Sequence, residues 1–219
     1  MKGFETMTHH KTEYKNNKPE KGHGDKKTYN QKFQRKTPKR ITPSYLHNSG
    51  LYYLERFAAS KKHFITVMTR KAKRSSMHHK DQDMAECVKM INELADKFER
   101  CGLLNDDIYT DGLVSSLRRK GLSRNAILTK MLMKGIDKDK TLTVLNKLDL
   151  DHHEDHQTAE KAAALKIARK KKIGPYYIKD DEQDIRKSLS KLARAGFSYD
   201  IAQYIVKMTT DDLDNLDSI

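Results

Sequence analysis

The chain has 219 residues, of which 34% are charged and 36% hydrophobic, with a mean hydropathy of −0.88 and a net charge of +14. This composition is polar for a globular protein and predicts a folded part together with a solvated part. The sequence has no run of eighteen apolar residues and no apolar segment near its start. It therefore predicts neither a membrane span nor a secretory signal, and we expect a cytoplasmic protein.

Residues 1–41 form the first predicted region. Residues 1–40 hold twelve lysines and arginines but only four acidic residues, without a helical or strand period. Such a segment buries too little apolar surface to offset its ordering entropy, so we expect a disordered basic arm. The arm either adds salt-sensitive affinity for nucleic acid or serves only as a solubilising tail.

The first helical block spans residues 42–102. It begins at Thr42, a hydroxyl N-cap followed by proline, and a second helix is predicted over 60–73 before a loop at 74–81. An amphipathic third helix starts at Met84 and ends before Gly102. The two cysteines, Cys87 and Cys101, fall on the apolar side of that helix, where we expect free thiols packed as small hydrophobic groups.

The rest of the chain repeats this plan. The block 103–149 predicts three helices, which Asn105 or Asp106, Ser123 and Asp137 cap and which glycines separate. A polar linker at 150–157, a third block of helices at 158–210 and a short acidic tail at 211–219 follow. The helix at 158–173 belongs either to the third block or to a connector. No segment after Thr42 alternates with period two, so the predicted fold is all-α.

Three helix–turn–helix corners share one spacing of apolar, serine and apolar residues. The three sets are Leu54, Ser60, Phe64 and Met68; Leu117, Ser123, Ile127 and Met131; and Leu192, Ser198, Ala202 and Val206. A small residue two positions before each serine allows one helix to end, and the serine caps the next. The repetition predicts tandem three-helix units, each covering the apolar face of its neighbour.

Residues 42 to about 208 resemble the RecX regulatory proteins. The similar segments are TPSYLHNSGLYYLERFAAS, GLLNDDIYTDGLVSSLRRKGLSRNAILTKMLMKGID and ALKIARKKKIGPY with LARAGFSYDIAQYIV, and the match is closest to alphaproteobacterial members. The resemblance implies an elongated curved rod of helical repeats that lies in the groove of a RecA–DNA filament. There it would inhibit strand exchange and the coupled ATPase, in DNA repair by homologous recombination and in the SOS response. The basic arm and the DHHEDH segment depart from the family pattern.

Basic residues recur beside the three corners, and we expect them to contact filament acids or DNA phosphates. The expected contact residues are Lys61, Lys62, Arg118, Arg119, Lys120, Arg124, Lys130, Lys134, Lys170, Lys171, Lys191 and Arg194. Lys170 and Lys171 belong to a second basic group that also includes Lys166, Arg169 and Lys172. A solvated surface without a partner is the competing interpretation.

The sequence shows no catalytic constellation and no phosphate-cradling glycine loop, so we expect a monomeric binding protein without enzymatic activity or a cofactor. The histidine clusters do not present the convergent ligands that a zinc site needs. Two alternatives to RecA-filament regulation stay open. In one, the helix after Ser123 enters a major groove and Arg124 and Asn125 read base edges, as in a sequence-specific transcription regulator. In the other, the protein coats DNA without sequence preference.

Overall fold

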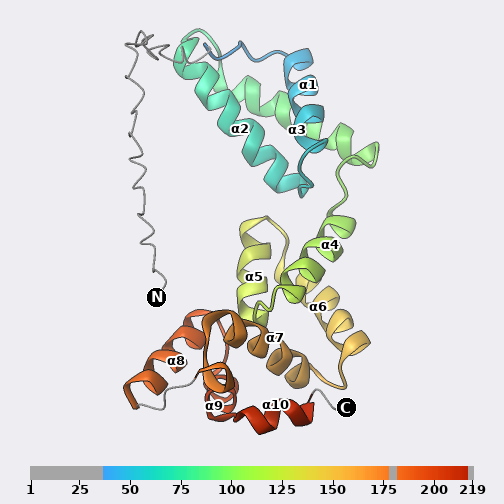
Figure 1. Ribbon diagram of the computed structural model, residues 1–219. Helices are drawn as coiled ribbons and strands as arrows, with labels where there is room; N and C mark the ends of the chain where they lie inside the picture. Colours follow the sequence, from blue (N-terminus) through green and yellow to red (C-terminus); the bar gives the residue numbers. More distant parts are fainter. Residues whose placement is uncertain (1–36, 178–181, 217–219) are drawn as a thin grey trace, which may run out of the picture. The chain divides into compact units, whose positions relative to one another are not determined.

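The computed structural model describes residues 37–177 and 182–216. This part of the chain is helical throughout and contains no strand, which confirms the predicted all-α fold (Figure 1). The elements are α1 Pro43–Leu54, α2 Lys61–His78, α3 Met84–Arg100, α4 Asp106–Arg119, α5 Arg124–Met133, α6 Lys138–His152, α7 His156–Lys171, η1 Gly174–Tyr176, α8 Glu182–Arg194, α9 Tyr199–Lys207 and α10 Thr210–Leu216. Within the described residues, no helix is both long enough and apolar enough to cross a membrane.

The predicted capping residues begin their helices as expected. Thr42, Ser60, Ser123 and Ser198 each accept a hydrogen bond from a backbone N–H three residues later. Asn105, not Asp106, caps α4, because its side chain accepts from two backbone N–H groups of the first turn.

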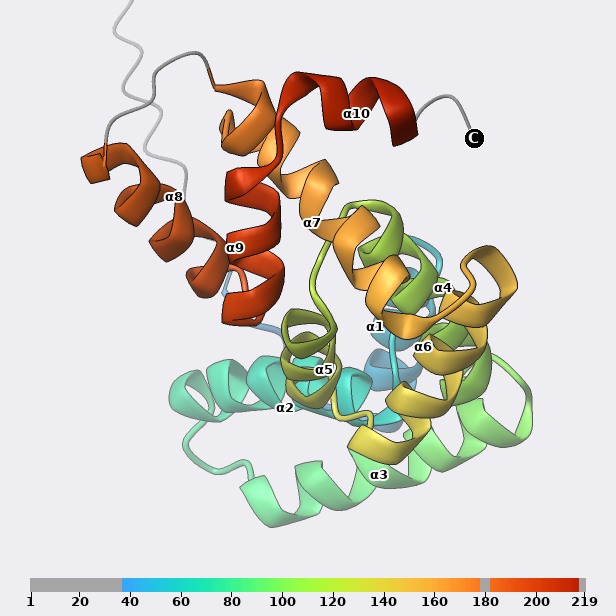
Figure 2. The same cartoon turned by 90° about the horizontal axis from the view of Figure 1, so that it is seen from below.

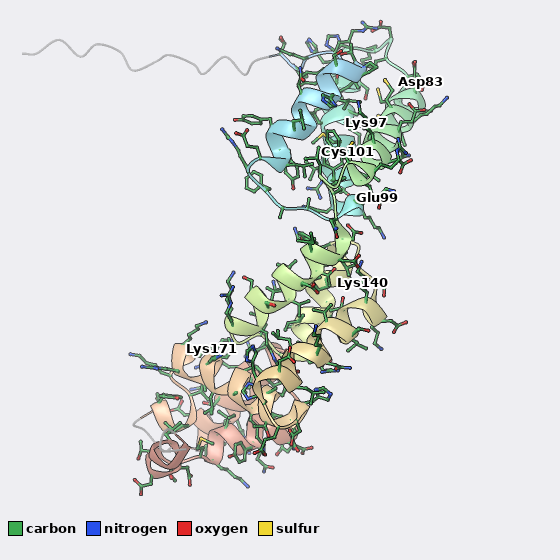
Figure 3. All side chains as sticks on the ribbon, turned by 90° about the vertical axis from the view of Figure 1, so that its right-hand side faces the viewer. Asp83, Lys97, Glu99, Cys101, Lys140 and Lys171 are labelled. Carbon is green, nitrogen blue, oxygen red and sulfur yellow. The ribbon has the colours of Figure 1, made fainter. Side chains whose placement is uncertain are left out.

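The first helix group, α1 to α3, packs around two phenylalanines. The ring centroids of Phe64 and Phe98 lie 5.6 Å apart, and both side chains are buried. Gly50 of α1 lies against this pair, since an added Cβ would stand 2.8 Å from the Phe98 ring. Cys87 is buried in the same core, whereas Cys101 is exposed just beyond α3; both are free. The expectation that both thiols would be packed is therefore wrong for Cys101 (Figure 3).

The second and third helix groups have cores of their own. In the second, α4 to α6, Val114, Ile127, Met131 and Leu145 are fully buried. The third group consists of α7 to α9 with η1, and its core combines the small residues of α7 with larger ones of α8 and α9. Figure 2 shows α9 between α7 and α8, in agreement with the packing of both helices against it.

Two serines at the corners also join neighbouring groups. Ser60 donates to the carbonyl of Lys134, and Ser123 donates to the carbonyl of Ala195 at 2.7 Å. Each accepting carbonyl directly precedes a glycine of positive φ, Gly135 or Gly196. The corner at Gly196 therefore corresponds to the corner at Gly135, between the second and third helices of a group.

Ser198 is consequently not the counterpart of Ser60 and Ser123, although its spacing in the sequence suggested so. In the third group the first corner holds Gly174, whose φ is +57° and whose position would bring an added Cβ within 2.2 Å of the Ile205 carbonyl oxygen. The residues between α7 and Gly174 are Lys172 and Ile173, so this corner has no serine cap. Spacing alone does not distinguish the first corner of a group from its second.

Several boundaries differ from the prediction. Helix α2 continues to His78, so the expected loop at 74–81 is shorter, because the buried Ser75 bonds to the carbonyl of Lys39 at 2.9 Å. The linker expected at 150–157 shrinks to three residues, since α6 reaches His152 and Asp155 caps α7. The expected acidic tail contains α10.

The predicted arm, 1–41, lies mostly outside the described residues. Its last part is anchored to the folded chain, because Ile41 is buried and Gln82 bonds to both its backbone N–H and its carbonyl, at 3.2 and 2.7 Å. Arg40 also pairs with Asp81. The folded part therefore begins before Thr42.

Candidate partner-binding surface

Contacts between helix ends bring basic residues of three helices together. The Lys170 ammonium donates to the carbonyl of Lys120, the C-cap of α4, at 2.7 Å. The neighbouring Lys171 donates to the carbonyl of Lys191 in the last turn of α8, at 3.4 Å. Ammonium groups are favourable there because the carbonyl ends of helices carry partial negative charge.

We define a cationic surface by eight exposed basic residues on or directly after α4, α7 and α8. Its members are Arg119 and Lys120 of the α4 end, Lys166, Arg169, Lys170 and Lys171 of α7, and Lys191 and Arg194 of α8. Six of the eight are expected contact residues. The other two, Lys166 and Arg169, lie four residues and one residue before Lys170 on the same helix.

Arg118, an expected contact residue, is buried instead. Its Nε and Nη2 donate to the carboxylate of Asp149 at 2.8 and 3.0 Å, and its Nη1 donates to Glu160 at 2.6 Å. Its side chain is 9% exposed and that of Asp149 is 1% exposed. A planar guanidinium suits this arrangement because it can bond to two carboxylates at once. The sequence did not indicate this role, since the two acids are 31 and 42 residues away.

Arg124 is also engaged inside the protein. Its Nη2 donates to Asn146, and its Nη1 lies 3.6 Å from Asp149. Its backbone N–H donates to Glu160 at 3.1 Å. Asn125 donates to the carbonyl of Gly196 at 3.2 Å. The start of α5 therefore faces the third helix group, so the two residues expected to read bases are held by internal contacts.

The four remaining expected residues lie on α2 and α5. Lys61 pairs with Asp96 and Glu99, both at 2.7 Å, and these bonds raise the pKa of its ammonium. The Lys134 ammonium lies 3.3 Å from Nε2 of His63. Lys62 and Lys130 are exposed but do not belong to the cationic surface.

A pocket of about 390 Å³ opens at one end of the cationic surface, between α4, α6 and α7. Arg119 and Lys166 line it together with Ser115, Leu148, His152 and His153, and the Arg118–Asp149 ion pair contributes to its wall. Two further hollows, of about 640 and 450 Å³, share Leu103 near the first helix group. No group of three or more potential metal ligands occurs among the described residues.

Comparisons with known proteins point to one family. The chain is 35% identical to "Regulatory protein RecX" of Myxococcus xanthus over 173 residues, covering 78% of this chain and 89% of that protein. It is 29% identical to the protein of the same name from Agrobacterium fabrum, covering 79% and 88%. No protein-family model matches.

Solved structures agree with this result at the level of the fold. A crystal structure of RecX from Lactobacillus salivarius superposes with a TM-score of 0.52 at 22% identity, covering 81% of this chain and 97% of the other. A crystal structure of a second regulatory protein RecX gives a TM-score of 0.53 at 15% identity, covering 74% and 70%.

Proposed function

Because the chain belongs to the RecX family of regulatory proteins, we propose that it binds the RecA recombinase filament on DNA and modulates its activity. The proposed effect is inhibition of strand exchange and of the coupled ATPase. We further propose that the protein acts by binding and not by catalysis, as a monomer in the cytoplasm.

The cationic surface is the observation that supports a polyanionic partner. Eight exposed basic residues from α4, α7 and α8 lie on it, and none of them forms an ion pair with an acidic side chain among the described residues. A nucleoprotein filament presents both phosphates and acidic side chains to such a surface.

Sequence-specific reading of DNA by α5 receives less support. A recognition helix presents its N-terminal residues to base edges in the major groove. Here Arg124 donates a hydrogen bond to Asn146, and Asn125 donates one to the Gly196 carbonyl. These bonds would have to break before the two side chains could contact bases.

The test is the DNA-dependent ATPase of RecA in the presence of the full chain. We expect inhibition at or below one protein per recombinase subunit. In a variant with Lys170, Lys171 and Lys191 changed to Glu, we expect half-inhibition to require about tenfold more protein, because the change replaces attraction with repulsion.

The matched control reverses three exposed charges of the first helix group, Lys73, Arg74 and Lys89, and should inhibit like the unmodified chain. Absence of any effect on the ATPase at all ratios would contradict the proposed function. Equal loss of inhibition in both variants would show that inhibition depends on the net charge of the protein and not on the cationic surface.

A further inference from the structure

The pocket between α4, α6 and α7 combines positive charge with flat and apolar groups. The carboxylates of Asp149 and Glu160 are matched by the guanidinium groups of Arg118 and Arg124. The exposed side chains of Arg119 and Lys166 therefore leave the pocket with a net positive charge. Its remaining lining offers the hydroxyl of Ser115, the side chain of Leu148 and two imidazoles.

The helix ends around the pocket determine which groups can bind an anion there. Both α4 and α6 end beside it, and their carbonyl groups oppose the approach of an anion. The ammonium of Lys170 donates a hydrogen bond to the Lys120 carbonyl at the end of α4. An anion must therefore be held by the full charges of Arg119 and Lys166, because the backbone gives it no support.

The dimensions favour an unpaired nucleotide. A volume of about 390 Å³ lies near the lower end of the range for small-ligand sites, which is large enough for one nucleotide. Unpaired bases bind to proteins chiefly by stacking on flat side chains, including histidine, while basic residues follow the backbone. His152, His153 and Leu148 line the pocket beside Arg119 and Lys166, so a base there can contact an imidazole.

We propose that this pocket binds one nucleotide of a single-stranded nucleic acid, with its phosphate on Arg119 and Lys166 and its base against Leu148 and His152. This inference extends the proposed function, because it places the DNA of the filament on the cationic surface. The strand leaves the pocket toward Lys170 and Lys120, since the end of α6 and the α6–α7 turn carry the acidic residues Asp151, Glu154 and Asp155.

The experiment measures binding of a fluorescent oligothymidylate to the full chain in the absence of recombinase, over a series of salt concentrations. Changing Arg119 and Lys166 to Gln should weaken binding at least tenfold. The slope of log affinity against log salt should also fall by about 1.4, because two contacts to a single strand release about 0.7 counterion each. Both residues are exposed, so the melting temperature should not change.

The control changes Lys73 and Lys89 to Gln, which removes the same charge from α2 and α3 and should alter affinity less than twofold. His152→Ala should weaken binding about fivefold or more without changing the salt slope, because stacking does not release counterions. A duplex of equal length should compete poorly.

Three results would overturn the inference: equal losses in the pocket and control variants, efficient competition by the duplex, or displacement of the strand by a nucleoside triphosphate at equal phosphate concentration. The last would assign the pocket to free nucleotides. Because recombinase is absent, these results are independent of the ATPase test, so failure of the proposed function and failure of this inference can be told apart.

Discussion

The two joints between helix groups use the same serine contact but differ in what surrounds it. At the first joint, between α1–α3 and α4–α6, Ser60 bonds to the Lys134 carbonyl and the backbone N–H of Lys61 donates to Asp106 at 2.8 Å. At the second, Ser123 bonds to the Ala195 carbonyl, and the Arg118–Asp149–Glu160 network links α4, α6 and α7. Helix α6 also packs against α7.

The first joint is accordingly more open to solvent. The hollow of about 640 Å³ lies at this joint, and two of its lining residues, Leu103 and Ile108, are 49% and 71% exposed. At the second joint the side chains of Arg118 and Asp149 are only 9% and 1% exposed. The repeated serine thus sets which groups meet, while the residues around it set how firmly they are held.

The largest expected effect comes from removing the carboxylate at the centre of the second joint. Asp149→Ala leaves the buried guanidinium of Arg118 with only one acidic partner, and loss of one member of a buried ion pair costs about 3–5 kcal/mol. We expect urea denaturation to show a fall of this order in the free energy of unfolding.

The control is Asp96→Ala at the first helix group, where Lys61 keeps Glu99 and both acids are half-exposed. The urea concentration at the midpoint of its unfolding should be almost unchanged, because exposed ion pairs contribute little to stability. If both variants unfold at the same urea concentration, the buried network does not distinguish the two joints.

A matched pair of glycines compares the joints more finely. Gly135 and Gly196 have φ values of +86° and +89°, so alanine meets the same backbone penalty at each, about 1–2 kcal/mol. At Gly135 the added Cβ would stand 2.5 Å from the Cβ of Lys62, which can move only together with the backbone of α2. At Gly196 it stands 2.5 Å from the Ser123 hydroxyl, whose displacement loses a cap and an inter-group hydrogen bond.

We expect Gly135→Ala and Gly196→Ala each to cost about 2–4 kcal/mol, measured by urea denaturation, because each adds a steric clash to the backbone penalty. Gly102→Ala supplies the baseline, because its φ is +74° and nothing lies within 4 Å of an added Cβ. A cost at either glycine no larger than that of Gly102→Ala would mean that the joint at that glycine accommodates the added Cβ.

The sequence predicted most of the helices because their ends are local features. Thr42, Ser123 and Asp137 each cap the helix that directly follows, and the glycines stop the preceding ones. The periodic apolar residues after Ser60 and Ser123 are buried as expected. These signals depend on neighbours within about eight residues.

The candidate site was predicted only in part, because burial of a charge depends on distant residues. Arg118 and Arg119 are adjacent and chemically equal, yet one is buried against Asp149 and Glu160 and the other is exposed. Their helical positions differ by about 100°, and only the packing of α6 and α7 decides which faces inward. Local sequence patterns likewise do not predict the hydrogen bond of Lys170 to the end of α4, because the two residues are fifty positions apart.

The smallest expected effect is a pH dependence confined to the first joint. Burial, with the charges of Lys134 and Arg70, lowers the pKa of His63 below its ordinary value of 6.5. Between that value and the lower folded pKa, the unfolded chain binds more protons at this residue than the folded chain does. The contribution of His63 to stability is therefore complete above about pH 6.5 and declines as the pH falls through this window.

Hydrogen exchange of the amides at the start of α2 measures this effect where it should occur, because imidazolium at position 63 would face the Lys134 ammonium 3.3 Å away. We expect these amides to lose protection on acidification from pH 7 to 5, and His63→Gln to remove most of that change. Amides at the start of α5, which Ser123 caps at the second joint, serve as the internal reference. If the Gln variant shows the same pH dependence as the unmodified chain, another group controls the opening of the first joint.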